Sequence, residues 1–128
     1  MNIGLLLAVG TGGFIGAIFR LLISTWVQER LITTGFPYGT LTVNILGSFF
    51  MGFLFMYFSH VNLSIYQKLI FTTGLLGALT TFSTFSMETI ILLKEEEYIK
   101  TIINIFLNIS LSISATLIGI WIFRVVYK

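Results

Sequence analysis

Four long apolar stretches dominate this sequence of 128 residues. They cover about residues 2–27, 38–59, 66–93 and 99–126, and short polar or charged segments separate them. A bilayer core about 30 Å thick is crossed by roughly 20 apolar residues in an α-helix, so each stretch is long enough to span it. Charged residues make up 9% of the chain, whereas soluble domains carry about 25%. The sequence therefore predicts an all-α integral membrane protein with four helices in a single domain, residues 1–128.

The positive charges are divided almost equally between the two sides of this predicted bundle. The side of the termini and the second turn carries Lys68, Arg124 and Lys128. The side of the first and third turns carries Arg20, Arg30, Lys94 and Lys100. The difference in the number of Lys and Arg residues between the two sides is too small to fix the orientation of the chain in the membrane. The chain therefore either inserts in both orientations or takes one orientation for reasons that its charge does not reveal. Because the cations are scattered, no nucleic-acid partner is expected.

Small residues recur every fourth position in the first span, and an arginine continues the series: Gly4, Ala8, Gly12, Gly16 and Arg20. Residues four apart share one helix face, and a face of small residues lets another backbone come close. A guanidinium in an apolar stretch is costly unless it reaches water or a partner. Arg20 therefore either extends its head to the membrane surface or faces a water-filled vestibule.

Two further spans carry polar stripes at the same spacing. The second span has Thr40, Asn44, Ser48 and Gly52, and the fourth has Asn104, Asn108, Ser112 and Thr116. A hydroxyl in a membrane helix can bond back to its own turn, but a carboxamide brings two donor hydrogens and an acceptor. The mid-span asparagines indicate either polar walls that face each other across a pore or hydrogen bonds that hold the helices together.

The third span contains the most unusual segment, GLLGALTTFSTFSMET over residues 74–89. Glycines followed by β-branched residues weaken a helix, so a break in the middle of the membrane is predicted. Carbonyls freed by such a break are hard oxygen ligands that suit Na⁺ or a similar cation. Phe82 and Phe85 share a helix face, and their ring edges carry partial positive charge. Glu88 is the only carboxylate inside a predicted span.

These segments resemble the Fluc (CrcB) fluoride channels over essentially the whole chain. The matching stretches are GGFIGAIFR (12–20), GTLTVNILGSFFMG (39–52) and the segment at 74–89. The resemblance implies a channel of the cell membrane that exports cytoplasmic fluoride passively and so protects against its toxicity. It also implies an antiparallel, dual-topology homodimer, for which the balanced charges are suited.

The resemblance further implies roles for individual residues. The backbone carbonyls of Gly77 and Thr80 from both subunits are expected to hold a structural Na⁺ at the dimer interface. Arg20 is expected in the vestibule. The fluoride pathway is expected to include Asn44, Phe82, Phe85, Ser83, Thr84, Thr42, Glu88, Asn108 and Ser112. The fourth span departs from the family, which usually has Tyr where this chain has Asn104 and often Ser where it has Asn108.

Fluoride is small and strongly hydrated, so a pathway for it must replace the lost water with donors that do not hold the ion too tightly. The Asn44 amide and the Ser and Thr hydroxyls are predicted to do this. The edges of Phe82 and Phe85 would add weak, numerous contacts. A path too narrow for the larger ion would then exclude chloride.

Two other classes of membrane protein compete with this interpretation. A proton-coupled small multidrug exporter also has four spans, but it needs a mid-membrane carboxylate; the first span has none, and Glu88 lies near the end of the third. A non-conducting accessory protein would explain the small-residue stripes but not the mid-span asparagines. An enzyme is not expected, because the single histidine, His60, lies in a short turn without an evident partner.

Overall fold

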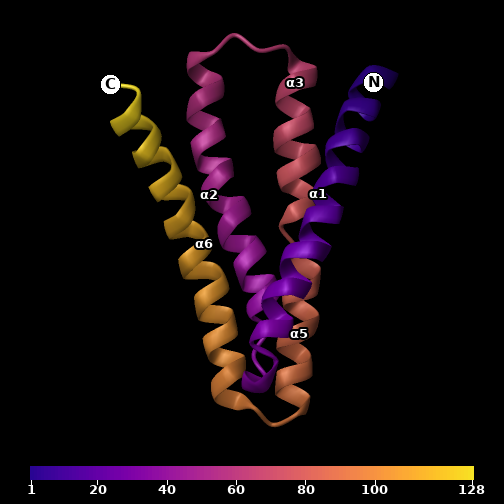
Figure 1. The fold of residues 1–128 in the computed structure, drawn as a ribbon, viewed down its shortest axis with the longest axis vertical. Helices are drawn as coiled ribbons and strands as arrows, with labels where there is room; N and C mark the ends of the chain where they lie inside the picture. Colours follow the sequence, from indigo (N-terminus) through magenta and orange to yellow (C-terminus); the bar gives the residue numbers. More distant parts are fainter.

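The computed structural model describes residues 1–128 as four membrane-crossing helical segments (Figure 1). The first crossing is α1 (Ile3–Arg30), which a short 3₁₀ turn, η1 (Ile32–Thr34), connects to α2 (Tyr38–His60). The third crossing is divided into α3 (Ile65–Leu69), the π-helical segment η2 (Ile70–Leu76), α4 (Gly77–Leu79) and α5 (Phe82–Lys94). The fourth is α6 (Tyr98–Val126). The prediction of an all-α protein with four long apolar helices and a broken third helix is confirmed.

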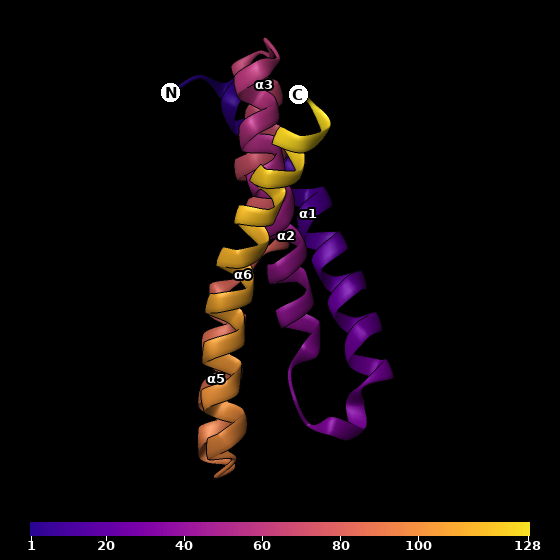
Figure 2. The same cartoon turned by 90° about the vertical axis from the view of Figure 1, so that its left-hand side faces the viewer.

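Both chain termini and the α2–α3 connection lie at one end of the bundle, and the other two connections lie at the opposite end (Figure 1). Figure 2 shows the molecule turned by 90°. In its lower half, which contains the α1–α2 and α5–α6 connections, α5 and α6 lie together on one side and the lower ends of α1 and α2 lie on the other. The first helix continues to Arg30, past the predicted end at Val27. The Arg30 guanidinium lies 4.4 Å from the centre of the Trp26 ring, and this contact one turn apart favours the extra helical residues.

Glycines allow close backbone contact between two pairs of helical segments. A methyl group at Gly12 or Gly16 of α1 would overlap the backbone carbonyl of Ile70 or Leu75, respectively. Gly52 and Gly119 play the same part between α2 and α6. Small residues at these points allow the backbones to approach, as is usual for helix pairs in membranes. The stripe in the first span is therefore a packing face for the N-terminal half of the third.

The third crossing is interrupted at Thr80 and Thr81, both of which have extended backbone conformations. The interruption lies within the predicted segment but after its glycines, which remain in helical turns. The Thr81 hydroxyl caps α5 by accepting a hydrogen bond from the Thr84 N–H at 3.2 Å. A threonine at this position can satisfy a free N–H of the new helix, which explains why the break falls at the hydroxyl-rich residues.

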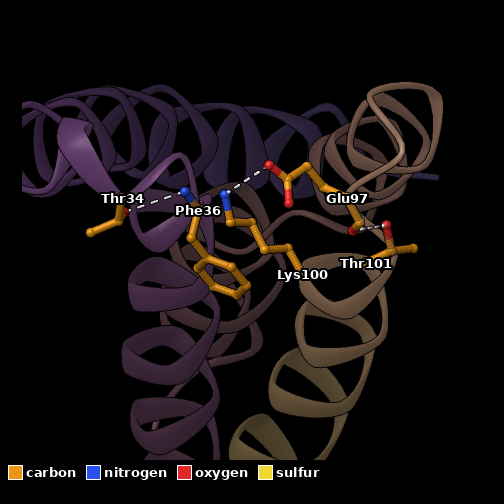
Figure 3. A network of polar contacts seen from close by, with 5 residues as sticks. All are labelled: Thr34, Phe36, Glu97, Lys100 and Thr101. Carbon is orange, nitrogen blue, oxygen red and sulfur yellow. Dashed lines mark hydrogen bonds and ion pairs between the residues drawn. The ribbon is translucent and has the colours of Figure 1, made fainter.

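The end of the bundle that contains two connections is held by short polar contacts (Figure 3). Lys100 at the start of α6 forms an ion pair with Glu97 at 3.2 Å, and its side chain reaches toward the backbone of Phe36 (Figure 3). The Thr101 hydroxyl donates to the Glu97 carbonyl at 2.9 Å, and the Phe36 N–H donates to the Thr34 hydroxyl at 3.3 Å. Exposed pairs of this kind contribute about 1 kcal/mol or less, so they position the loops more than they stabilise the bundle.

Candidate functional site

The Asn44 side chain on α2 connects three helical segments at the break. Its Oδ1 accepts a hydrogen bond from the Thr81 N–H at 2.8 Å. Its Nδ2 donates to the Thr81 carbonyl at 3.2 Å and to Asn108 Oδ1 on α6 at 2.9 Å. A carboxamide has two hydrogens to donate, and both are engaged here. Asn44 thus replaces the helical partners that the backbone of Thr81 loses.

The hydrogen-bonded chain continues along α6. Asn108 Nδ2 donates to both the carbonyl and the Oδ1 of Asn104, at 3.0 and 2.9 Å. Asn104 Nδ2 donates to the Thr89 hydroxyl on α5 at 3.0 Å, and that hydroxyl donates to the Phe85 carbonyl at 2.8 Å. The predicted polar stripe of the fourth span therefore faces the protein interior and joins α6 to both α2 and α5.

A groove of about 350 Å³ lies beside this hydrogen-bonded chain, and its lining combines polar and hydrophobic residues. It is lined by Asn44, Ser48, Thr80, Thr81, Phe82, Phe85, Asn108, Ile109, Ser112 and Ile113. The rings of Phe82 and Phe85 meet edge to face, with centroids 5.3 Å apart. Phe82 is 77% exposed, whereas Phe85 is buried. The structure therefore brings five of the predicted pathway residues to one groove: Asn44, Phe82, Phe85, Asn108 and Ser112.

A second cavity of about 310 Å³ lies between α1, α2 and α5 and is lined in part by Thr40, Thr84 and Glu88. The Thr40 hydroxyl donates to Glu88 Oε1 at 2.7 Å, while the buried Glu88 Oε2 has no partner. Thr84 accepts a hydrogen bond from the Thr81 hydroxyl at 3.0 Å, and Ser83 lies 3.4 Å from the same hydroxyl. Hydroxyls at the start of α5 thus connect the groove to the cavity of Glu88.

Four predicted site residues line neither cavity, namely Arg20, Thr42, Gly77 and Ser83. The Thr42 hydroxyl bonds back to the Tyr38 carbonyl of its own helix at 2.8 Å and lines neither cavity. Arg20 is half-buried on α1 and forms no ion pair within the chain.

Residues that the sequence did not single out also belong to the site, namely Thr81 and Thr89. Thr89 could have been noticed because it lies one helical turn after Phe85, where its hydroxyl can bond back to the backbone.

The backbone at the break supplies oxygen atoms of the kind that a sodium ion prefers. In an unbroken helix the Gly77 carbonyl would accept from the Thr81 N–H, and the Thr80 carbonyl from the Thr84 N–H. Here both N–H groups donate to side chains instead, the first to Asn44 and the second to Thr81. Hard carbonyl oxygens without helical partners at the negative end of a helix suit a hard cation. The residues present therefore fit the predicted ion.

Comparison with known proteins identifies the family. Residues 7–120 match the family described as CrcB-like protein, Camphor Resistance (CrcB). The chain belongs to the CrcB family. It is 52% identical to the "Fluoride-specific ion channel FluC" of Nitratiruptor sp., over 99% of this chain and 98% of that protein. The protein of the same name from Sulfurovum sp. is 55% identical over 96% of each chain, and that from Campylobacter lari is 48% identical over 95% and 99%.

These findings confirm the resemblance read from the motifs. The CrcB relatives carry the name of an ion channel and not of an enzyme, and the four apolar helices make this chain a multi-pass membrane protein. The predicted roles of single residues in the pathway, including those of Thr42, Arg20 and Glu88, stay predictions.

Proposed function

We propose that this CrcB protein is a fluoride-specific ion channel that lets cytoplasmic fluoride leave the cell down its electrochemical gradient. The similarity to proteins named for that activity over nearly the full length of the chain carries the proposal. The groove at the helix break gives it a physical basis, because its lining contains hydroxyl-bearing residues and two phenylalanines but no Lys or Arg. A fixed cation there would hold a small anion too firmly for rapid passage.

Fluoride would lose its water shell in the groove and gain weaker, more numerous contacts. Ser48 and Ser112 offer hydroxyls from α2 and α6, and the exposed Phe82 ring offers its positive edge. Since both Asn44 hydrogens are donated to protein oxygens, this residue would contact the ion directly only by exchanging one of those bonds. The hydroxyls of Ser83 and Thr84 would then lead the ion toward the Glu88 cavity.

We also propose that two copies pair in antiparallel, dual-topology fashion around the break. Gly77 and Phe82 are exposed on the single chain, next to backbone carbonyls that have lost their helical partners. Polar backbone groups facing lipid without partners cost several kcal/mol each, so a second copy covering this surface would remove the cost. The nearly balanced cations permit insertion in both orientations.

The carbonyls of Gly77 and Thr80 from both copies would hold the structural sodium ion at this interface. The bound ion would supply positive charge against the carbonyl end of α4, where the helix dipole is negative. Within the chain, Asn44 and the Thr81 hydroxyl keep those carbonyls free by taking the N–H groups of Thr81 and Thr84.

Efflux from liposomes tests the channel proposal. Vesicles loaded with potassium fluoride or potassium chloride receive the purified protein and a potassium ionophore, and ion-selective electrodes record the release. Fluoride release without chloride release is expected. An accessory protein would pass neither ion, and dye efflux that disappears in Glu88→Gln would indicate a proton-coupled exporter instead.

Cysteine cross-linking tests the proposed dimer, because the natural chain contains no cysteine. A Gly77→Cys variant should form a covalent dimer on oxidation in membranes, since the same position from both copies would meet at the axis. Ser114→Cys, which is exposed on α6, serves as the control and should remain monomeric on denaturing gels. Equal cross-linking of both variants would contradict the proposed interface.

A further inference from the structure

The carboxamides of α6 are committed to bonds inside the protein. Asn104 is 0% exposed and Asn108 is 6% exposed. Asn108 donates both of its amide hydrogens to Asn104 and accepts the Asn44 amide with its Oδ1. It therefore has no donor left for a passing anion, although it borders the groove. This arrangement argues for a role other than the pathway contact that its polar stripe predicts.

We propose that Asn104 and Asn108 are positioning residues that orient the Asn44 carboxamide and thereby hold the helix break in its conducting geometry. The connection runs from Thr89 to Asn104, then to Asn108 and Asn44, and ends on the backbone of Thr81. Each link joins a donor to an acceptor at 2.8–3.0 Å. Neither α6 residue touches the fluoride ion in this proposal.

The Asn44 carboxamide can satisfy the backbone of Thr81 in only one of its two orientations. The Thr81 N–H requires an acceptor and the Thr81 carbonyl requires a donor, and Asn44 offers one of each. If the Asn44 amide turned over, its NH₂ would face the Thr81 N–H and its oxygen would face the Thr81 carbonyl. Asn108 opposes this turn because its Oδ1 accepts the second hydrogen of Asn44 Nδ2. Asn104 in turn fixes which atom Asn108 presents, since it takes both Asn108 hydrogens.

Two simpler roles make different predictions. If the α6 asparagines only fill space, the variant at the most buried position, Asn104, should cause the greatest damage. If Asn108 contacts the anion, its replacement should slow fluoride without changing the bond between Asn44 and Thr81. A positioning role instead predicts effects that grow with proximity to Asn44 along the hydrogen-bonded chain and that appear at the Thr81 N–H.

The experiment compares Asn108→Leu, Asn104→Leu and Thr89→Val with the natural chain. Ser110→Ala on the same helix is the matched control, because the Ser110 hydroxyl bonds only to the Phe106 carbonyl of its own turn. Fluoride efflux is recorded from liposomes, and deuterium exchange of the Thr81 amide is followed by ¹⁵N NMR in detergent micelles. Thr89→Val keeps the side-chain shape and tests the far end of the chain if a leucine variant does not fold.

The expected result is slower efflux together with faster Thr81 exchange. Both should change by about tenfold for Asn108→Leu and about threefold for Thr89→Val, with Asn104→Leu in between, which is the size of one hydrogen bond between membrane helices. Ser110→Ala should match the natural chain in both measurements.

The proposal is overturned if Thr81 exchange in all three variants equals that of Ser110→Ala, if Asn104→Leu has the largest effect, or if Asn108→Leu slows efflux with unchanged exchange. The efflux measurement rests on the proposed channel function, whereas the exchange measurement does not. A natural chain that releases no fluoride would refute the channel, and the Thr81 exchange rates would still decide the role of the asparagines.

Discussion

The two halves of the third crossing contact the rest of the protein in different ways. The first half, Ile65–Leu79, lies close against α1, where Gly12 and Gly16 leave room for backbone carbonyls. The second half, α5, has only Phe85 and Leu92 buried along its length. Its first turn instead exposes Phe82, Ser83 and Thr84.

The first half of this crossing is therefore the scaffold side, which fixes the packing, and the second half is the pathway side, which borders the proposed fluoride pathway. Backbone contact through glycines needs no polar partner and fixes the shape of the first half. The second half keeps donors accessible because it packs less closely, and Asn44 holds the boundary between the two by replacing the helical partners of Thr81. A membrane helix can change character in this way only where its freed backbone groups are satisfied by the protein.

Enlarging a glycine on the scaffold side should have the greatest effect. In Gly16→Val the new side chain would overlap the Leu75 carbonyl, so the free energy of unfolding should fall by about 3 kcal/mol. Circular dichroism during denaturant titration in micelles measures this change. Gly10→Val is the matched control, because a Cβ there meets no atom within 4 Å; equal destabilisation of the two variants would contradict the close packing of this half.

Removing the boundary residue should stop conduction. Asn44→Leu leaves the Thr81 N–H, the Thr81 carbonyl and Asn108 Oδ1 without partners, and each such group costs about 1–3 kcal/mol. We expect fluoride efflux from liposomes to fall by about a hundredfold, equivalent to about 2.7 kcal/mol. Asn62→Leu, in the exposed α2–α3 connection, should keep the natural rate. An undiminished rate in Asn44→Leu would show that the break does not depend on this side chain.

On the pathway side, Phe82→Ile should slow fluoride efflux by about tenfold, because the loss of the polarised ring edge removes about 1 kcal/mol of favourable contacts. The fold of each single chain should change little, since Phe82 is 77% exposed on it. Phe55→Ile, at a phenylalanine that is 68% exposed on α2 and outside the groove, is the control. If Phe82→Ile carries fluoride at the natural rate, the aromatic part of the account is wrong.

The smallest effect is expected at the loop beyond α5. Lys100→Ala removes the exposed ion pair with Glu97, so stability should fall by less than about 1 kcal/mol. Unfolding of the natural chain and the variant at low and high salt measures the contribution, and the difference should shrink as salt is added. A large loss of stability that persists in high salt would mean that this contact anchors α5, and it would contradict the loose packing of the second half of the third crossing.

The spans could be predicted from the sequence because their length and apolarity leave few alternatives. The break was also predictable as a region, since glycines and β-branched residues weaken a helix between 74 and 89. Its position at Thr80 and Thr81 was not, because it depends on Asn44 reaching across from α2. Periodicity predicts which residues share a helix face, but it does not reveal which residue on another helix supplies the partner.

The site shows the same limit. Spacing placed Asn44, Asn108 and Ser112 on polar faces, and the structure places these faces along one groove. The number of free hydrogens on each carboxamide could not be predicted, because hydrogen bonds between helices depend on tertiary packing. Thr42 was expected in the pathway only from the resemblance to the family, and its hydroxyl bonds to its own helix.

Selective passive conduction can be measured most directly by recording current across a planar bilayer that contains the purified protein. Fluoride is present in a tenfold gradient and chloride in the opposite gradient. If the hydroxyls and ring edges admit only the smaller anion, the reversal potential should equal the equilibrium potential of fluoride, about 59 mV from zero. A reversal potential that follows chloride, or no current above that of the bare bilayer, would contradict the account.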